Sequence, residues 1–422
     1  MNSGLIDEFR WRGLVAQMSD EDGLAEHLDT VPRTLYCGFD PTADSLHIGS
    51  LIPLLALRRF QLAGHRPILL LGGATGLIGD PSFRDDERQL NSTDVVAGWV
   101  AALRQQVERF LAFDGQNAAV ICNNLDWTQN LGVIEFLRDV GKHFSVNAMI
   151  QRDSVKARLD REGQGISYTE FSYMLLQGMD FLELARRHDC SLQIGGSDQW
   201  GNIVSGMDLI RRNLARQAYA MTLPLVTKSD GNKFGKTATG TIWLDPRKTS
   251  PYSFYQFWLN TADADVGKFL RLFTFLSKEE IETLDDMSKT QPELRKSQHR
   301  LAEEVTELVH GAEALAAAKR ISGGLFGGDL DSLTESDLAQ LLQDGLASSS
   351  VSPGTGLLTV LAGSDLAKSI GEARKLVQGG GVRLNNVVVE SPTAQIDFED
   401  AFFGRFYLLR KGKKSFHLVV RQ

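Results

Sequence analysis

The sequence predicts an α/β protein that begins with a doubly wound parallel sheet and continues with a helical domain and a small basic domain. Short apolar segments alternate with helical patterns over the first half of the chain, and from about residue 245 the pattern is helical alone. Strands that are separated by helices form a mostly parallel sheet with helices on both faces. The last 57 residues are basic in a chain whose net charge is −8, which marks them as a separate unit.

Four segments are expected as strands of the sheet, and four segments as its main helices. The strands are 34–40, 66–73, 118–124 and 191–196; the helices are 51–64, a long helix ending near Phe113, 167–189, and one beginning at Ser197. Ligands of such sheets bind at the carboxyl ends of the strands. We therefore expect a site in the loops that follow Phe39, Gly73, Asn124 and Gly196.

The composition divides the chain into four parts, which are 1–244, 245–322, 323–355 and 356–422. The second part is helical, and the third is a Gly/Ser-rich connector with some helix inside it. From Leu366 to Gln422 there are ten lysines and arginines and five acids, so this segment carries a charge of +5. Either it seeks a polyanion, or it presents a solvated basic face.

Composition also excludes several classes of protein. Hydrophobic residues make up 42% and charged residues 23%, which is ordinary for a globular chain. No run approaches the ~18 apolar residues that cross a bilayer, and the first residues do not resemble a secretory signal. The cysteines Cys37, Cys122 and Cys190 are too few and too far apart for a disulfide framework or a zinc cluster. We expect a cytoplasmic protein without a protein-held metal site.

The segment from Gly72 to Asp80 follows a strand but lacks the glycine spacing of a dinucleotide site and the GK[ST] ending of a Walker loop. This argues against a nicotinamide oxidoreductase. The segment is either a tight turn or part of a ligand site. Behind it, Arg84 and Arg88 lie in a polar loop, where they are either solvated or act as clamps on a phosphate.

The helix 167–189 carries a polar strip on an otherwise apolar surface. At 100° per residue, Thr169, Tyr173, Gln177 and Asp180 fall within about 80° of one another. A buried polar strip must form an internal network or line a cavity. In a cavity, Asp180 together with Asp80 would suit an ammonium group.

Two further segments have the composition of a phosphate site. In "SLHIGS", His47 lies where a strand passes into a helix, and Ser50 closes the segment. In "LVTKSDGNKFGKTATG", Lys233 and Lys236 are three apart among glycines and hydroxyl residues. This second segment is either a surface loop or a loop that closes over a polyphosphate.

These motifs, in this order, resemble the class I aminoacyl-tRNA synthetases, and among them the bacterial tyrosyl-tRNA synthetases. "HIGS" is similar to the family's HIGH motif and "KFGKT" to its KMSKS loop. "YCGFDPTADSLHIG", "GGATGLIGDPS", "SYTEFSYMLLQ" and "LQIGGSDQWGN" are also close to the family, and the tail resembles an RNA-binding module. The resemblance covers nearly the whole chain. It implies a Rossmann-like catalytic domain ending in the KFGKT loop, an α-helical domain and a small α+β RNA-binding domain.

The resemblance also implies a reaction and its partners. The enzyme would join L-tyrosine to ATP, with accompanying Mg²⁺, to form tyrosyl-adenylate, and would then transfer tyrosine to tRNA(Tyr). It would act as a homodimer. The alternatives are a synthetase for another aromatic amino acid and a catalytically impaired, synthetase-like RNA-binding protein. Ser50, which replaces the second histidine of the motif, is the departure that favours the impaired protein.

The resemblance assigns roles to individual residues. Tyrosine would contact Tyr36, Asp80, Tyr173, Gln177, Asp180 and Gln199. ATP would contact Cys37, Gly38, Asp40, His47, Gly49, Gly196, Asp198 and Lys236. The transition state would be stabilised by His47, Ser50, Arg84, Arg88, Lys233, Lys236 and Thr237. The tRNA would contact Arg374, Lys375, Arg383, Arg410, Lys411, Lys413 and Lys414.

Overall fold

The computed structural model describes residues 4–81, 90–160, 165–229, 231, 234–237, 240–327, 329–364, 366–412 and 415–422. The chain forms two compact units. The first contains Met1–Leu244 and Ala262–Ser297, and the second contains Asp245–Thr261 and Gln298–Gln422. The four-part division expected from composition remains a prediction.

The first unit is built on a six-stranded sheet in the order β1-β6-β5-β2-β3-β4. All neighbouring strands are parallel except β1 and β6, which are antiparallel. The strands are β1 (Gln17–Met18), β2 (Thr34–Phe39), β3 (Arg66–Leu71), β4 (Val120–Asn123), β5 (Cys190–Gly196) and β6 (Tyr219–Leu223). The expected α/β class and all four expected strands are confirmed. Strands β1 and β6 are additional to the prediction.

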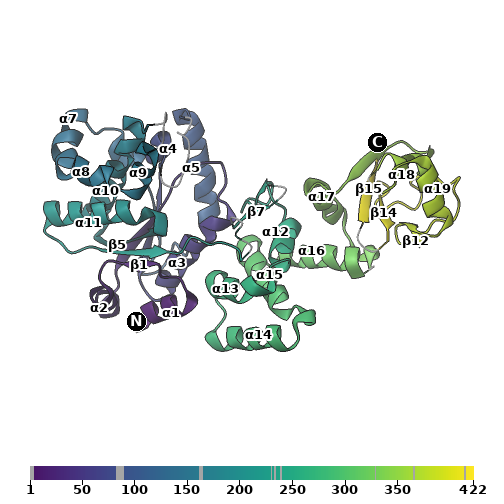
Figure 1. Ribbon diagram of the computed structural model, residues 1–422, viewed down its shortest axis with the longest axis horizontal. Helices are drawn as coiled ribbons and strands as arrows, with labels where there is room; N and C mark the ends of the chain where they lie inside the picture. The colour runs from purple at the N-terminus through teal and green to yellow at the C-terminus, as the bar shows by residue number, and fades with distance from the viewer. Residues whose placement is uncertain are drawn as a thin grey trace. The chain divides into compact units, whose positions relative to one another are not determined.

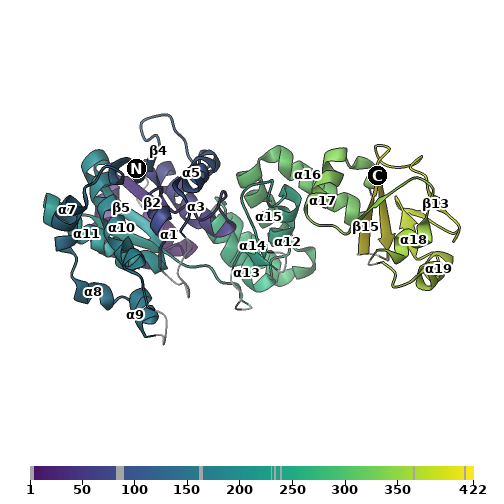
Figure 2. The same ribbon diagram turned by 90° about the horizontal axis from the view of Figure 1, so that it is seen from above.

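Helices cover both faces of this sheet, and Figures 1 and 2 show α10 and α11 on one side of the strands and α3 on the other. The helices of the first unit are α1 (Leu5–Arg12), α2 (Glu21–Thr30), α3 (Leu51–Leu62), α4 (Thr75–Ile78), α5 (Thr93–Val107), α6 (Leu125–Thr128), α7 (Val133–Glu135), α8 (Val146–Ile150), α9 (Asp153–Leu159), α10 (Tyr168–His188), α11 (Trp200–Leu214), α13 (Asp263–Phe273) and α14 (Lys278–Thr290). Helix α5 ends at Val107, before the expected end near Phe113. Helices α13 and α14 are separate because Ser277 and Glu280 form a capping box that starts the second helix.

Helix α10 positions much of the polar strip. It begins where the Ser167 hydroxyl accepts the N–H of Glu170, and it ends at Asp189 in the left-handed conformation. Its apolar residues, Phe181 and Leu184 among them, join Tyr36, Ile68 and Leu70 of the sheet in one buried core. With its apolar residues in this core, α10 presents Tyr173, Gln177 and Asp180 to a cavity at the ends of the strands.

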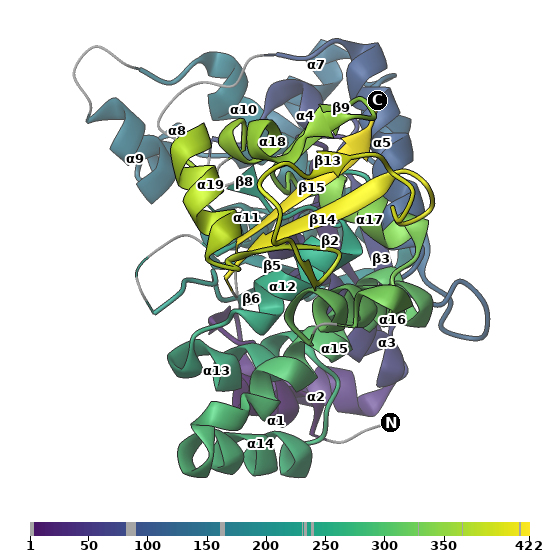
Figure 3. The same ribbon diagram turned by 90° about the vertical axis from the view of Figure 1, so that its right-hand side faces the viewer.

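The second unit combines helices with a five-stranded sheet in the order β12-β11-β14-β15-β9. Its helices are α12 (Pro251–Leu259), α15 (Lys296–His310), α16 (Ala312–Ser322), α17 (Glu335–Gln343), α18 (Leu357–Ala362) and α19 (Ile370–Gln378). Its strands are β9 (Ser348–Val351), β10 (Thr355–Gly356), β11 (Val382–Leu384), β12 (Val387–Val388), β13 (Gln395–Ile396), β14 (Phe406–Lys411) and β15 (Ser415–Arg421). Figure 3 shows β14 and β15 side by side with α18 and α19 near them. Strand β9 completes the sheet as a parallel neighbour of β15, so part of the expected connector belongs to this domain.

Among the described residues, the model contains no helix that is both long and apolar enough to cross a membrane.

Candidate active site

A cavity of about 360 Å³ opens at the carboxyl ends of the parallel strands. Its walls include residues that directly follow β2 and β5, together with Asn124 after β4 and Thr75 after β3. The cavity thus lies where the sequence predicts a ligand site. The first turn of α3 and one face of α10 complete the walls.

Fourteen residues proposed from the sequence line this cavity. They are Tyr36, Cys37, Gly38, Asp40, His47, Gly49, Ser50, Asp80, Tyr173, Gln177, Asp180, Gly196, Asp198 and Gln199. Thr169, which shares the polar strip of α10, is not among the lining residues. Arg84, Arg88 and Lys233 lie outside the described residues, and so do the side chains of Lys236 and Thr237. The backbone of Lys236 and Thr237 forms β7, which pairs with β8 (Gly240–Thr241).

The buried part of the cavity contains Tyr36 and Asp180. The Asp180 carboxylate accepts hydrogen bonds from Asn124 Nδ2 at 3.0 Å and from Trp127 Nε1 at 2.9 Å. Burial raises the pKa of Asp180 to about 7, although those two hydrogen bonds oppose the rise. The Tyr36 hydroxyl is buried and has no hydrogen-bond partner among the described residues. This part of the cavity therefore offers one acceptor and one hydroxyl to a ligand.

The polar strip of α10 both lines the cavity and belongs to a network, so the two alternatives left open by the sequence hold together. The Tyr173 hydroxyl donates to Asp40 Oδ2 at 2.7 Å, and the Thr75 hydroxyl donates to Asp40 Oδ1 at 2.6 Å. Asn124 Nδ2 donates to Thr75 Oγ1 at 3.0 Å, which connects this chain to Asp180. The network fixes the rotamers of these side chains before any ligand binds.

A second group of polar side chains lies nearer to β5. Gln199 Nε2 donates to Asp80 Oδ2 at 2.7 Å and to Asp198 Oδ2 at 3.0 Å. Burial raises the pKa of Asp198, and the nearby Asp80 raises it further. Because Asp40, Asp80, Asp180 and Asp198 all line one cavity, its potential favours a ligand that carries a cationic group.

His47 stands at the start of α3, where it caps a short helical turn over Ile48–Ser50. Its Nδ1 accepts the N–H of Gly49 at 3.0 Å. Burial lowers the pKa of His47 below its ordinary value of 6.5, so the ring is neutral at pH 7. A neutral ring whose Nδ1 is an acceptor carries its proton on Nε2. His47 can therefore donate one hydrogen bond to an anion.

Gly49 is required by the ring of His47. A Cβ at this position would lie 2.8 Å from His47 Cε1 and 3.0 Å from Nδ1. In the structure the histidine ring therefore occupies the space beside Gly49. Ser50 lines the cavity. Its hydroxyl forms no hydrogen bond within the described part of the chain.

A smaller apolar pocket of about 240 Å³ adjoins the first cavity. The two share His47, Gly49, Pro53 and Gly196, and the smaller one is also lined by Ile52, Leu223, Pro224, Leu225, Val226 and Phe234. An apolar slot beside a polar cavity suits a flat aromatic base. The site thus combines an acidic, polar region with an apolar one.

Comparison with known proteins agrees with this geometry. Residues 29–327 match the model of the class I tRNA synthetases for W and Y, and residues 337–419 match the C-terminal domain model of SYY-like tyrosine–tRNA ligases. The chain belongs to the class I tRNA synthetase family. It is 57% identical over 418 residues to a tyrosine–tRNA ligase of Chromobacterium violaceum, with 99% of each chain covered. It is 58% identical to one of Aliivibrio fischeri, covering 99% of this chain and 98% of the relative.

Solved structures support the same family. A C-terminally truncated mitochondrial tyrosyl-tRNA synthetase of Aspergillus nidulans matches with a TM-score of 0.69 at 30% identity, covering 76% of this chain and 94% of that one. The Rossmann-like description of the synthetase sheet is thereby confirmed.

Sequence reasoning missed several polar residues of this synthetase site. Asn124 and Trp127 bond to Asp180, and Thr75 bonds to Asp40. Thr42 and Gln193 also line the cavity, and the Gln193 Oε1 is buried without a partner among the described residues. Asn124 could have been found, because it is the last residue of the predicted strand 118–124. Trp127 gave no signal, since its role depends on how α6 meets α10.

The basic residues of the C-terminal synthetase domain lie in two places. Arg374 and Lys375 are exposed on α19, and Arg383 and Arg410 are opposite one another on β11 and β14. Lys411 Nζ donates to the carbonyl of Leu366 at 2.7 Å and lies 3.4 Å from Glu372. Lys413 and Lys414 lie outside the described residues. Lys411 therefore has a role within its own domain.

The raised pKa of Asp180 predicts that tyrosine binding depends on pH. Raising the pH from 6 to 8 ionises Asp180, and an ionised carboxylate accepts a phenol hydrogen bond more strongly. We expect the Kd for tyrosine to fall about tenfold over this range, because the competent fraction rises about tenfold. Fluorescence titration of tyrosine at each pH measures this change. In Asp180→Asn the dependence should disappear, and a flat wild-type profile would contradict the prediction.

Proposed function

We propose that this chain is a tyrosine–tRNA ligase, which activates L-tyrosine with ATP and then transfers the tyrosyl group to tRNA(Tyr). The observation that carries the proposal is the buried pair of Tyr36 and Asp180, because a hydroxyl and an acceptor at the bottom of a cavity suit a phenol. Relatives that share 57–58% identity over nearly the whole chain and are named tyrosine–tRNA ligases support it.

Tyrosine-dependent exchange of pyrophosphate into ATP tests the proposal. Exchange should occur with tyrosine, and it should be weak with phenylalanine, which leaves the buried polar groups unpaired. Tryptophan should be equally poor because its indole is larger than a phenol. Absence of exchange at saturating tyrosine would support the impaired, RNA-binding alternative. The intact polar cavity and the full-length relatives do not favour that alternative.

Tyrosine would bind with its phenol at Tyr36 and Asp180. Its ammonium group would lie among Asp80, Tyr173 and Gln177, where carboxylates favour a cation, and Gln199 would lie near its carboxylate. The Gln177 Oε1 already accepts from Asn202 Nδ2 at 3.0 Å, which orients its amide nitrogen for other contacts. The adenine of ATP would occupy the apolar pocket, with Cys37, Gly38, Gly196 and Asp198 near the ribose.

The chemistry requires positioning more than proton transfer. The carboxylate of tyrosine is already a nucleophile, so it attacks the α-phosphorus of ATP without a general base, and pyrophosphate leaves. The Nε2–H of His47 would donate to a phosphate oxygen. The cations Arg84, Arg88, Lys233 and Lys236, with Thr237, would stabilise the charge that develops on the phosphates. Mg²⁺ would arrive with ATP, and the described residues hold no group of three or more His, Cys, Asp or Glu that could bind a metal.

Ser50 is expected to weaken one phosphate contact relative to the histidine found in the family motif. The Ser50→His variant should therefore raise the rate of adenylate formation by up to about tenfold, because a longer donor regains part of the stabilisation that one transition-state donor supplies. Single-turnover formation of tyrosyl-adenylate measures it, with Ser50→Ala as the comparison that removes the hydroxyl. An unchanged or lower rate in Ser50→His would show that another group makes this contact.

The C-terminal domain would bind tRNA through its exposed cations. Reversing the charge of Arg374 and Lys375 together should raise the KM for tRNA by about tenfold or more, because each phosphate contact contributes to binding in a salt-dependent way. The other kinetic parameters should not change. Pyrophosphate exchange by the same variant should match that of the wild type, which provides an internal control. Equal KM values for tRNA in the two proteins would refute the assignment of α19.

The enzyme would be a homodimer, and one exposed apolar segment is a candidate for its interface. Val133, Ile134, Leu137 and Val146 expose 72%, 75%, 45% and 56% of their surface within one stretch of chain. Apolar groups concentrated in this way are typical of protein–protein contacts. Sedimentation of the wild type and of Ile134→Glu tests the proposal, and the variant should shift toward monomer. The cytoplasmic location expected from composition remains a prediction.

A further inference from the structure

The lysine-bearing loop, residues 227–241, is attached to the His47 segment at its far end. Leu244 N donates to the carbonyl of Leu46 at 2.9 Å, and Ile48 N donates to that of Ile242 at 2.9 Å. Ile242 N in turn donates to the carbonyl of Gly235 at 3.0 Å. Gly235 has φ of +79°, and a Cβ there would lie 2.4 Å from Ile48 Cγ2. Backbone hydrogen bonds therefore connect the His47 segment directly to the end of the lysine-bearing loop.

Near its start, the loop is held at Ser229 by a carboxylate on α13. Asp265 accepts the N–H of Ser229 at 3.1 Å through Oδ1, and the Ser229 hydroxyl donates to its Oδ2 at 3.0 Å. Asp265 is only 6% exposed whereas Ser229 is exposed, so these charge-assisted bonds are partly buried. One turn later, Lys268 Nζ donates to the carbonyl of Thr227 at 3.4 Å.

The same helix also holds the middle of the loop through aromatic contacts. The ring of Phe234 stacks on that of Phe273, with centroids 5.2 Å apart and planes at 20°. It meets Phe269 edge to face at 5.1 Å. Helix α13 therefore contacts the loop at Ser229 through Asp265 and at Phe234 through two phenylalanines.

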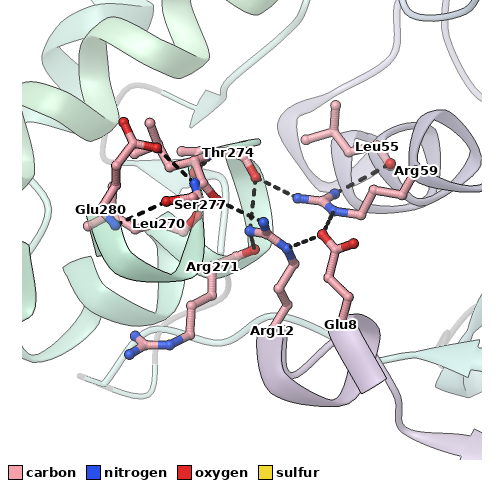
Figure 4. Close-up of polar contacts among 10 residues, drawn as sticks. Glu8, Arg12, Leu55, Arg59, Leu270, Arg271, Thr274, Ser277 and Glu280 are labelled. Atoms are coloured by element: carbon pink, nitrogen blue, oxygen red, sulfur yellow. Dashed lines mark hydrogen bonds and ion pairs between the residues drawn. The ribbon is translucent and has the colours of Figure 1, made fainter. Parts of the chain in front are cut away.

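The other end of α13 is fixed to the helix that follows His47. Arg59 of α3 donates to the carbonyl of Thr274, and Arg12 of α1 donates to those of Thr274 and Leu276 (Figure 4). Both arginine side chains are buried, and Arg12 pairs with Glu8 at 2.8 Å. Helix α3 begins beside His47. These bonds therefore fix the position of α13 relative to the His47 side of the cavity, where phosphates are proposed to bind.

We propose that Asp265 is a positioning residue for ATP activation, which fixes the start of the lysine-bearing loop at Ser229 although it does not line the cavity. The inference rests on the proposed function. Its consequence is specific. Without the Asp265 carboxylate, the loop loses its attachment at Ser229, while the residues of α10 and β2 that are proposed to bind tyrosine keep all their contacts. Loss of Asp265 should therefore affect ATP and leave tyrosine binding unchanged.

The test measures pyrophosphate exchange by Asp265→Ala, with the KM for ATP and for tyrosine determined separately. We expect kcat/KM for ATP to fall about ten- to a hundredfold, because displacement of positioning groups by about 1 Å has effects of this size. The Kd for tyrosine should change less than about twofold. Asp265→Asn keeps an acceptor for the Ser229 N–H and should recover part of the loss. Asp286→Ala removes an exposed carboxylate that pairs with Lys289 on the neighbouring helix α14, and it serves as the control.

A double variant identifies Ser229 as the partner. In Asp265→Ala, adding Ser229→Ala should cause no further loss, whereas Ser229→Ala alone should reduce kcat/KM for ATP by a few-fold. Equal exchange by Asp265→Ala and the wild type would overturn the proposal. The proposal would also be overturned if Asp265→Ala and Asp265→Asn both weakened the binding of tyrosine as much as that of ATP. Equal weakening would indicate a general effect on folding. If the wild type itself shows no exchange, the proposed function has failed instead.

Discussion

Asp180→Ala is expected to lower kcat/KM for tyrosine in pyrophosphate exchange by about a hundredfold or more. The substitution removes the proposed acceptor for the phenol, together with the acceptor of Trp127 Nε1 and one of the two acceptors of Asn124 Nδ2. Hydrogen bonds to a charged group contribute about 1.5–3 kcal/mol each, so the loss of this group has an effect of that order. The measurement is the initial rate of exchange as a function of tyrosine concentration.

The control for this variant lies on the same helix. Glu183→Ala, three residues further along α10, removes a carboxylate that pairs with Arg186 and Arg187 and does not line the cavity. Its kcat/KM should stay close to that of the wild type. Asp180→Ala should also reduce the preference for tyrosine over phenylalanine, because the penalty for a missing hydroxyl disappears with its acceptor. An unchanged preference would mean that the phenol binds elsewhere.

His47→Ala is expected to reduce the rate of adenylate formation by about 10²–10³-fold with little change in the Kd for tyrosine. His47 presents one Nε2–H donor on the side of the cavity where the phosphates of ATP are proposed to bind. Removing a transition-state donor has effects of this size. Single-turnover formation of the adenylate at saturating tyrosine separates this loss from any change in binding.

Gly49→Ala should produce most of the same loss without altering the histidine itself. The new Cβ would lie 2.8 Å from His47 Cε1, so the ring must leave its position. Gly98→Ala is the matched control, because a Cβ at Gly98 of α5 has no neighbour within 4 Å. A Gly49→Ala enzyme as fast as the wild type would show that the position of the ring does not matter.

The order of strands and helices was largely predictable because it depends on local patterns. Strand β3, for example, is buried along nearly its whole length on both faces and is therefore a short apolar run, 66–71. The pattern could not find the ends of all elements. The helical periodicity of 263–281 continues through Thr274 to Leu276. In the structure α13 ends before these residues, and the carbonyl of Thr274 accepts hydrogen bonds from Arg12 and Arg59 of other helices. Strand β6 was not predicted, although Pro224 directly follows its last residue and marks its end.

The residue types of the site were also predictable, since the wording of the motifs is specific and fourteen of the proposed residues line one cavity. The sequence by itself determined the fold class, the family and these chemical groups. Only the tertiary structure decided how they are held: that Asn124 and Trp127 support Asp180, that the space beside Gly49 belongs to the ring of His47, and that Asp265 holds the loop at Ser229. For Asp180 and Asp265 the physical reason is that their contacts join residues from different elements, 36 to 56 positions apart, whereas sequence patterns record only what neighbouring residues require. The contact of His47 with Gly49 is local, but it depends on the rotamer of the histidine ring, which residue types do not specify.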